Sequence, residues 1–207
     1  MSAPGEVPNI VDQQVIHLFA LVAEAIAKAT EALLGDDVAL ARHVVDADDD
    51  IDQLVADVEK LVWERFAGLP SAPEDWRYLV MVLLILPELE RSADLAEHVA
   101  QRALTRIGGE MSPVSRGVVQ RMAEAAIGMW RTVADSYADR QGVLDAMVED
   151  DEELDLLHDR ITNEVIAESM PVPVGAQVTL IARFYERLGD HAVNLARRIS
   201  LLPTPSE

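Results

Sequence analysis

Four pairs of acidic side chains, each pair separated by four residues, are the feature of this sequence best suited to chemistry. They are Asp48 and Asp52, Glu90 and Asp94, Asp151 and Asp155, and Glu186 and Asp190. On a helix, residues four apart lie on the same face, where two like charges are destabilising. Hard cations bind carboxylate oxygens and neutralise their charge. We therefore interpret the pairs as candidate metal ligands.

A simpler interpretation stays open, because the chain contains 37 acidic residues and only 17 basic ones. In such a chain, an isolated pair of carboxylates is most often a solvated helix face. Two observations favour metal binding: the pairs recur at matching places, and apolar residues flank each of them.

Long helices are the elements that must position these pairs. The composition is half hydrophobic, with few aromatic residues and only 10 each of Gly and Pro, which favours helices over many short strands. The apolar spacing and the Gly and Pro breaks predict six helices. They cover residues 10–34, 37–67, 73–107, 113–139, 143–169 and 177–202. The second and third exceed 25 residues, which is typical of an extended bundle.

The two halves of the chain resemble each other. The segment ELERSADLAEHVAQRA (88–103) aligns with FYERLGDHAVNLARRI (184–199), and VVDADDDIDQLV (44–55) aligns with MVEDDEELDLLH (147–158). We predict an all-α fold of two tandem three-helix bundles related by pseudo-two-fold symmetry. The first unit covers 10–108 and the second 109–202, with flexible tails at 1–9 and 203–207. In each unit, antiparallel packing of the second and third helices would gather four carboxylates.

The charge and the apolar segments narrow the choice of partners and compartment. A formal net charge of −20 repels phosphate backbones and anionic membranes, so we expect neither nucleic-acid binding nor docking on an anionic membrane. We also expect no membrane insertion. The most apolar run, at 79–86, is too short to span a bilayer, and the first residues lack the pattern of a signal sequence. We expect a cytoplasmic protein.

The segment ERLGDHAVNLARRI (186–199) resembles the signature of the PhoU family, whose repeats carry E-R-x-x-D on their third helix. The resemblance extends over nearly the whole chain as two repeats. It implies a dimeric negative regulator of phosphate uptake and phosphate-starvation signalling, which contacts a phosphate ABC transporter and a sensor histidine kinase. It also implies multinuclear iron, zinc, magnesium or similar ions at the acidic motifs. The first repeat departs from the pattern at Ser92-Ala93, so we expect the second site to be better formed.

Two other functions fit parts of the sequence. A metal-free acidic adaptor would use the same carboxylates to bind a basic protein surface. A carboxylate-bridged di-iron protein would need E-x-x-H motifs, and the nearest spacing is Asp155-x-x-His158. We predict no catalytic residues and no enzyme activity. His98 and His191 lie close to the acidic pairs in sequence and are candidate accessory ligands.

Overall fold

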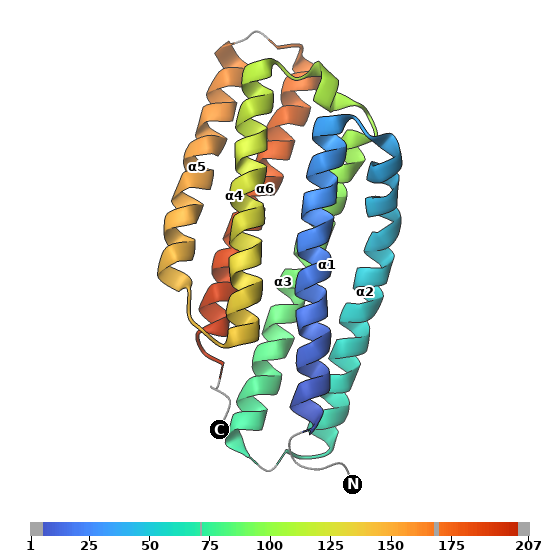
Figure 1. The fold of residues 1–207 in the computed structure, drawn as a ribbon, viewed down its shortest axis with the longest axis vertical. Coiled ribbons are helices and arrows are strands. Elements are labelled where there is room, and N and C mark those ends of the chain that lie inside the picture. Colours follow the sequence, from blue (N-terminus) through green and yellow to red (C-terminus); the bar gives the residue numbers. More distant parts are fainter. Residues whose placement is uncertain (1–5, 71, 168–169, 203–207) are drawn as a thin grey trace.

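The structure, a computed structural model, describes residues 6–70, 72–167 and 170–202, which form six α-helices and one short 3-10 helix (Figure 1). The first unit contains α1 (Glu6–Gly35), α2 (Val38–Ala67) and α3 (Pro73–Ala103). The 3-10 helix η1 (Ile107–Glu110) leads into the second unit, with α4 (Pro113–Asp139), α5 (Leu144–Ala167) and α6 (Val172–Ile199). The predicted all-α fold of two three-helix units is confirmed.

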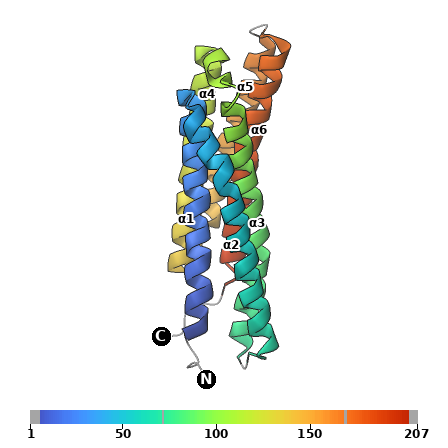
Figure 2. The ribbon, with the colours of Figure 1, turned by 90° about the vertical axis from the view of Figure 1, so that its right-hand side faces the viewer.

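The two units pack side by side and run in opposite senses (Figures 1 and 2). Within each unit all three helices contact one another, and between the units α1 packs on α4 and α3 packs on α6. Helices α2 and α5 therefore form the outer edges of the molecule. This arrangement agrees with the predicted pseudo-two-fold relation.

The helix ends follow the local sequence. Asp37 precedes α2, and its side chain accepts hydrogen bonds from the backbone amides of Ala39 and Leu40, both at 3.0 Å. Ser112 caps α4 in the same way by accepting from the amide of Ser115. Such caps satisfy backbone donors that have no partner within the helix.

The largest differences from the predicted boundaries occur at three helix ends. Helix α1 begins at Glu6, so residues 6–9, which were predicted to belong to a flexible tail, are helical. Residues 1–5 and the predicted tail at 203–207 lie outside the described residues. Helix α3 ends at Ala103, before the separate turn η1. Helix α6 begins at Val172 because Pro173 fits the first helical turn, where its missing amide hydrogen costs nothing.

The hydrophobic core runs without interruption through both units. At the α1–α4 contact, the buried ring of Phe19 lies 5.2 Å from that of Tyr137 and 6.4 Å from that of Trp130, measured between centroids. Asp12 of α1 accepts hydrogen bonds from Tyr78 of α3 at 2.7 Å and from Tyr137 of α4 at 2.9 Å. The units are distinct in topology but share one core.

The link between the units is held closely against the end of α1. A Cβ atom added at Gly108 would lie 2.0 Å from the carbonyl oxygen of Leu33, so only glycine fits. The amide of Gly109 donates to Asp36 at 3.1 Å, and Arg116 donates to the carbonyl of Gly108 at 2.9 Å. The predicted unit boundary at Gly108-Gly109 falls inside this segment.

Among the described residues, Ile10–Gly35 of α1 is the one helical stretch long and apolar enough to cross a membrane by length and composition. This stretch is longer than the apolar run at 79–86 that was the most apolar segment in the sequence. Val15, Leu18 and Val22 of α1 are fully buried, as in the core helix of a bundle. The packing against α2, α3 and α4 accounts for the apolar face.

Candidate metal centre

The first unit brings acidic side chains of α2 and α3 together. Asp48 and Asp52 of α2 and Asp94 of α3 each place one carboxylate oxygen within 4.8 Å of the others. Asp48 and Asp94 are half-buried, and Asp52 is exposed. These are three of the four residues that the sequence analysis assigned to this site; the fourth, Glu90, is exposed on α3 one turn before Asp94.

Burial and mutual repulsion make the ionised form of these carboxylates costly. Burial, followed by the charges of Asp52, Glu97, Asp94 and Asp49, raises the pKa of Asp48 to about 7. Burial is also the main cause of the raised pKa of Asp52. The same holds for Glu90, where the charges of Asp52 and Asp94 act in the same direction. A bound cation would remove this cost, because it favours the ionised form.

Glu97 contributes to the field at Asp48 and was missed by the sequence analysis. It lies three residues after Asp94, and this i, i+3 spacing on α3 is the signal that identifies it. One of its oxygens accepts a hydrogen bond from Gln101 at 2.8 Å.

The second unit places the corresponding four carboxylates on α5 and α6. Burial, followed by the charges of Asp190, Asp155 and Glu186, raises the pKa of Asp151 to about 6. Burial also raises the pKa of Glu186, although Arg183 and His158 act against it. The buried Oδ1 of Asp151 and the buried Oε2 of Glu186 have no hydrogen-bond partner among the described residues. Buried carboxylate oxygens without a partner are the donors that a hard cation satisfies.

A glycine allows α5 and α6 to approach closely at this point. A Cβ atom at Gly189 would lie 2.6 Å from Oδ1 of Asp151 and 2.6 Å from Cδ1 of Leu154. In the alignment of the two halves, Ala93 of α3 takes this position in the first unit. Gly189 therefore explains why the second motif requires a glycine directly before Asp190.

The two sites differ in a way that the sequence analysis did not predict. The second site was predicted to be the better formed, yet the compact group of three carboxylates lies in the first unit, and no equally compact group occurs elsewhere in the described part of the chain. In the second unit Glu186 forms an ion pair with Arg183, one turn earlier on α6. This pair engages one oxygen of Glu186 and leaves the other unpartnered.

The two candidate histidines lie at the α3–α6 contact between the units. The His98 ring stacks on Phe184 with centroids 5.3 Å apart, and its buried Nδ1 has no partner in the described structure. His191 is buried, and its Nδ1 lies 2.8 Å from Oγ of Ser92. Since Ser92 donates its own hydrogen to the carbonyl of Glu88, its oxygen accepts the Nδ1 hydrogen of His191. Neither histidine belongs to the compact carboxylate group.

Glu88 is a buried charge that the sequence analysis did not single out. Its side chain pairs with Arg198 of α6 at 2.8 Å and with Arg91 at 3.1 Å, and it is only 4% exposed. The signal was present in the sequence, because Glu88 falls among apolar positions whose helical spacing predicts burial. The Glu88–Arg198 pair joins α3 of the first unit to α6 of the second.

Comparison with known proteins identifies the family. The family model of the PhoU domain matches residues 15–103 and again residues 119–199. The chain belongs to the PhoU family. The two matched segments correspond to the two three-helix units, and the resemblance noted in the sequence is confirmed.

Relatives and solved structures agree with this assignment. A "Phosphate-specific transport system accessory protein PhoU homolog" of Aquifex aeolicus (strain VF5) is 33% identical over 84% of this chain and 81% of the relative. A homolog with the same description from Rhizobium meliloti (strain 1021) is 27% identical over the whole chain and 90% of the relative. The crystal structure of PhoU from Pseudomonas aeruginosa matches with a TM-score of 0.87 at 24% identity, covering 95% of this chain and 97% of that one. A PhoU structure from Streptococcus pneumoniae matches with a TM-score of 0.81 at 22% identity over 95% and 94% of the two chains.

Proposed function

We propose that this protein is a negative regulator of phosphate uptake and of phosphate-starvation signalling. The observation that carries the proposal is the PhoU family match over both units, together with relatives described as accessory proteins of the phosphate-specific transport system. The protein acts in the cytoplasm as a homodimer, through contacts with a phosphate ABC transporter and a sensor histidine kinase. It acts by binding partners and not by catalysis.

The eight paired carboxylates bind divalent or ferric cations in this proposal. Asp48, Asp52, Glu90 and Asp94 form one site, and Asp151, Asp155, Glu186 and Asp190 form the other. Support comes from the compact trio in the first unit, the unpartnered buried oxygens in the second, and the raised pKa values in both. The donors are all carboxylate oxygens, which suit magnesium and also bind zinc and iron in proteins. A bound cation supplies positive charge that fastens each outer helix to the centre of the molecule.

A second candidate function uses the same residues without metal. Asp52, Glu90, Asp155 and Asp190 are exposed, and the chain carries a net charge of −20. An acidic adaptor would bind a basic protein surface directly through these side chains. Metal analysis of protein purified without chelator separates the two candidates, because only the first requires bound metal.

Deletion of the gene in its host tests the regulatory proposal. We expect phosphate-starvation genes to stay switched on in phosphate-rich medium, as measured by a reporter of one such promoter. Complementation with the wild-type chain should restore repression. Complementation with an Asp151→Asn, Asp190→Asn double variant should restore less, while the exposed control Asp135→Asn should restore it fully. Normal repression in the deletion strain contradicts the regulatory role, and full repression by the double variant contradicts the role of the second site.

A further inference from the structure

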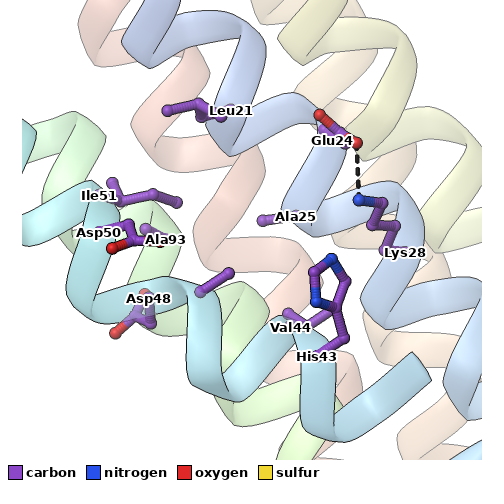
Figure 3. Close-up of a pocket in the computed structure, with 11 residues that line it drawn as sticks. Leu21, Glu24, Ala25, Lys28, His43, Val44, Asp48, Asp50, Ile51 and Ala93 are labelled. Atoms are coloured by element: carbon purple, nitrogen blue, oxygen red, sulfur yellow. Dashed lines mark ion pairs between the residues drawn. The ribbon is translucent and has the colours of Figure 1, made fainter. Parts of the chain in front are cut away.

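A cavity of about 230 Å³ lies between α1 and α2, beside the first-unit carboxylates (Figure 3). Its walls are largely apolar, formed by Leu21, Ala25, Val44, Ala47, Ile51 and Ala93. Val44 and Ile51 are each 4% exposed and Ala93 is 1% exposed, so these side chains are fixed by the core behind them. Drug-sized ligands occupy pockets of about 300–1,000 Å³, so this cavity suits a smaller molecule.

Charged side chains of opposite sign lie at the two ends of the cavity. Lys28 and His43 lie together at one end of the cavity, and Asp50 lies at the other (Figure 3). Asp48 also lines the cavity, but it is two residues from Asp50 on α2 and therefore lies on a different face of the helix, where its carboxylate belongs to the group with Asp52 and Asp94. His43 and Asp50 are seven residues apart on α2, which corresponds to about 10 Å along the helix. The cavity thus presents hydrogen-bond donors at one end, a carboxylate at the other, and an apolar wall between them.

We propose that this cavity binds a small zwitterion whose anionic and cationic ends are separated by a short aliphatic chain, as in an ω-amino acid. The anionic end accepts hydrogen bonds from Lys28 and His43, and the ammonium end donates to Asp50. The methylene groups lie against the apolar wall. An α-amino acid carries both charges on one carbon, so it cannot reach both ends of the cavity.

Glu24 competes with the anionic end of such a ligand. Its carboxylate pairs with Lys28 at 2.7 Å, one turn along α1 (Figure 3). The side chains of Lys28 and Glu24 are 35% and 56% exposed, and exposed pairs of this kind are weak. A ligand carboxylate can therefore replace Glu24, and removal of the Glu24 charge should make binding tighter.

Nuclear magnetic resonance of methyl groups tests the proposal, with 6-aminohexanoate as the probe. The protein carries ¹³C-labelled methyl groups, and EDTA is present so that no metal ion bridges probe and protein. We expect the methyl signals of Leu21, Val44 and Ile51 to shift in a saturable manner. The isomer 2-aminohexanoate has the same atoms with both charges at one end, and it should bind at least about tenfold more weakly. Hexanoate and hexylamine, which each carry one of the two charges, should also bind at least about tenfold more weakly.

Variants of α1 complete the test. Lys28→Met keeps the aliphatic stem and removes the charge, and it should weaken 6-aminohexanoate binding at least about fivefold. Glu24→Gln should strengthen binding, whereas Glu31→Gln, an exposed residue of the same helix outside the cavity, should leave it unchanged. The proposal is overturned if 6-aminohexanoate causes no saturable shift, if its isomer binds equally well, or if Lys28→Met has no effect. Circular dichroism of each variant confirms that the helices are intact.

Discussion

Replacement of Asp48 by Asn should stabilise the metal-free protein at pH 8. Burial and the neighbouring carboxylates raise the pKa of Asp48 from 3.8 to about 7 in the folded state. The folded state therefore holds this proton more tightly than the unfolded chain does. The stability that the group contributes is fully present below pH 4 and is lost as the pH rises towards 7. At pH 8 the ionised Asp48 opposes folding, and Asn removes this opposition.

The size of the effect follows from the shift and from the position of the side chain. A rise of about three pKa units corresponds to roughly 4 kcal/mol if the whole shift contributes to the free energy of unfolding. Asp48 is only half-buried, and solvent screening reduces the figure. We expect the free energy of unfolding to increase by about 1–2 kcal/mol at pH 8 and by clearly less at pH 5. Denaturation in urea with EDTA present, at both pH values, measures the difference.

A matched control separates the local effect from the loss of one negative charge. Asp46 is exposed two residues earlier on α2, and Asp46→Asn should change the free energy of unfolding by less than about 0.5 kcal/mol. A saturating divalent cation should reverse the order of stability, because it adds about 2.7 kcal/mol to the wild type at 100 times the dissociation constant. The reasoning fails if Asp48→Asn is destabilising in EDTA at pH 8, or if the two variants behave alike.

Three further predictions concern the second unit and the contact between the units. Asp190→Asn should lower the metal content of purified protein, measured by elemental analysis, while metal-free stability stays equal or rises; unchanged metal content would contradict its role as a ligand. Gly189→Ala should cost about 1–3 kcal/mol of unfolding free energy in urea, because its methyl group meets a carboxylate oxygen and a leucine. Gly128→Ala, with nothing within 4 Å in the middle of α4, should instead stabilise by about 0.5–1 kcal/mol, and equal effects at both glycines would refute the steric argument. Glu88→Ala should cost about 1–3 kcal/mol of unfolding free energy, because it removes the buried carboxylate that pairs with Arg198 and Arg91. A loss as small as that of the exposed control Glu149→Ala would show that the pair is unimportant.

The fold could be predicted from sequence because its signals are local and repeated. Helical apolar spacing predicts the length of α2 and α3, and the alignment of the two halves of the chain predicts the two units. The start of α6 could not be predicted with the same security, because a proline breaks a helix interior but suits a first turn, and only tertiary packing decides between them. At Gly175 that packing is close, since a Cβ atom there would lie 2.9 Å from Cγ1 of Val165.

The site was predictable as a set of residues but not as a geometry. The i, i+4 spacing places two carboxylates on one face of a helix, and the repeat assigns each pair to a unit. The spacing does not say where each carboxylate points, and the placement of the side chains distinguishes the compact trio around Asp48 from the group around Asp151. The ion pair between Glu186 and Arg183 could not be predicted either, because an arginine three residues away can point to solvent or to its neighbour.

Because the two units run in opposite senses, either unit could come first along the chain. Helix α1 begins and α6 ends towards the same end of the molecule, while the link at Gly108 lies at the other end (Figure 1). A two-fold relation of this kind is the geometry of a closed pair of identical subunits. A circular permutant that joins the natural termini and opens between α3 and α4 would keep every contact of α1 with α4 and of α3 with α6. The architecture is that of a dimer of single repeats made permanent by one covalent connection.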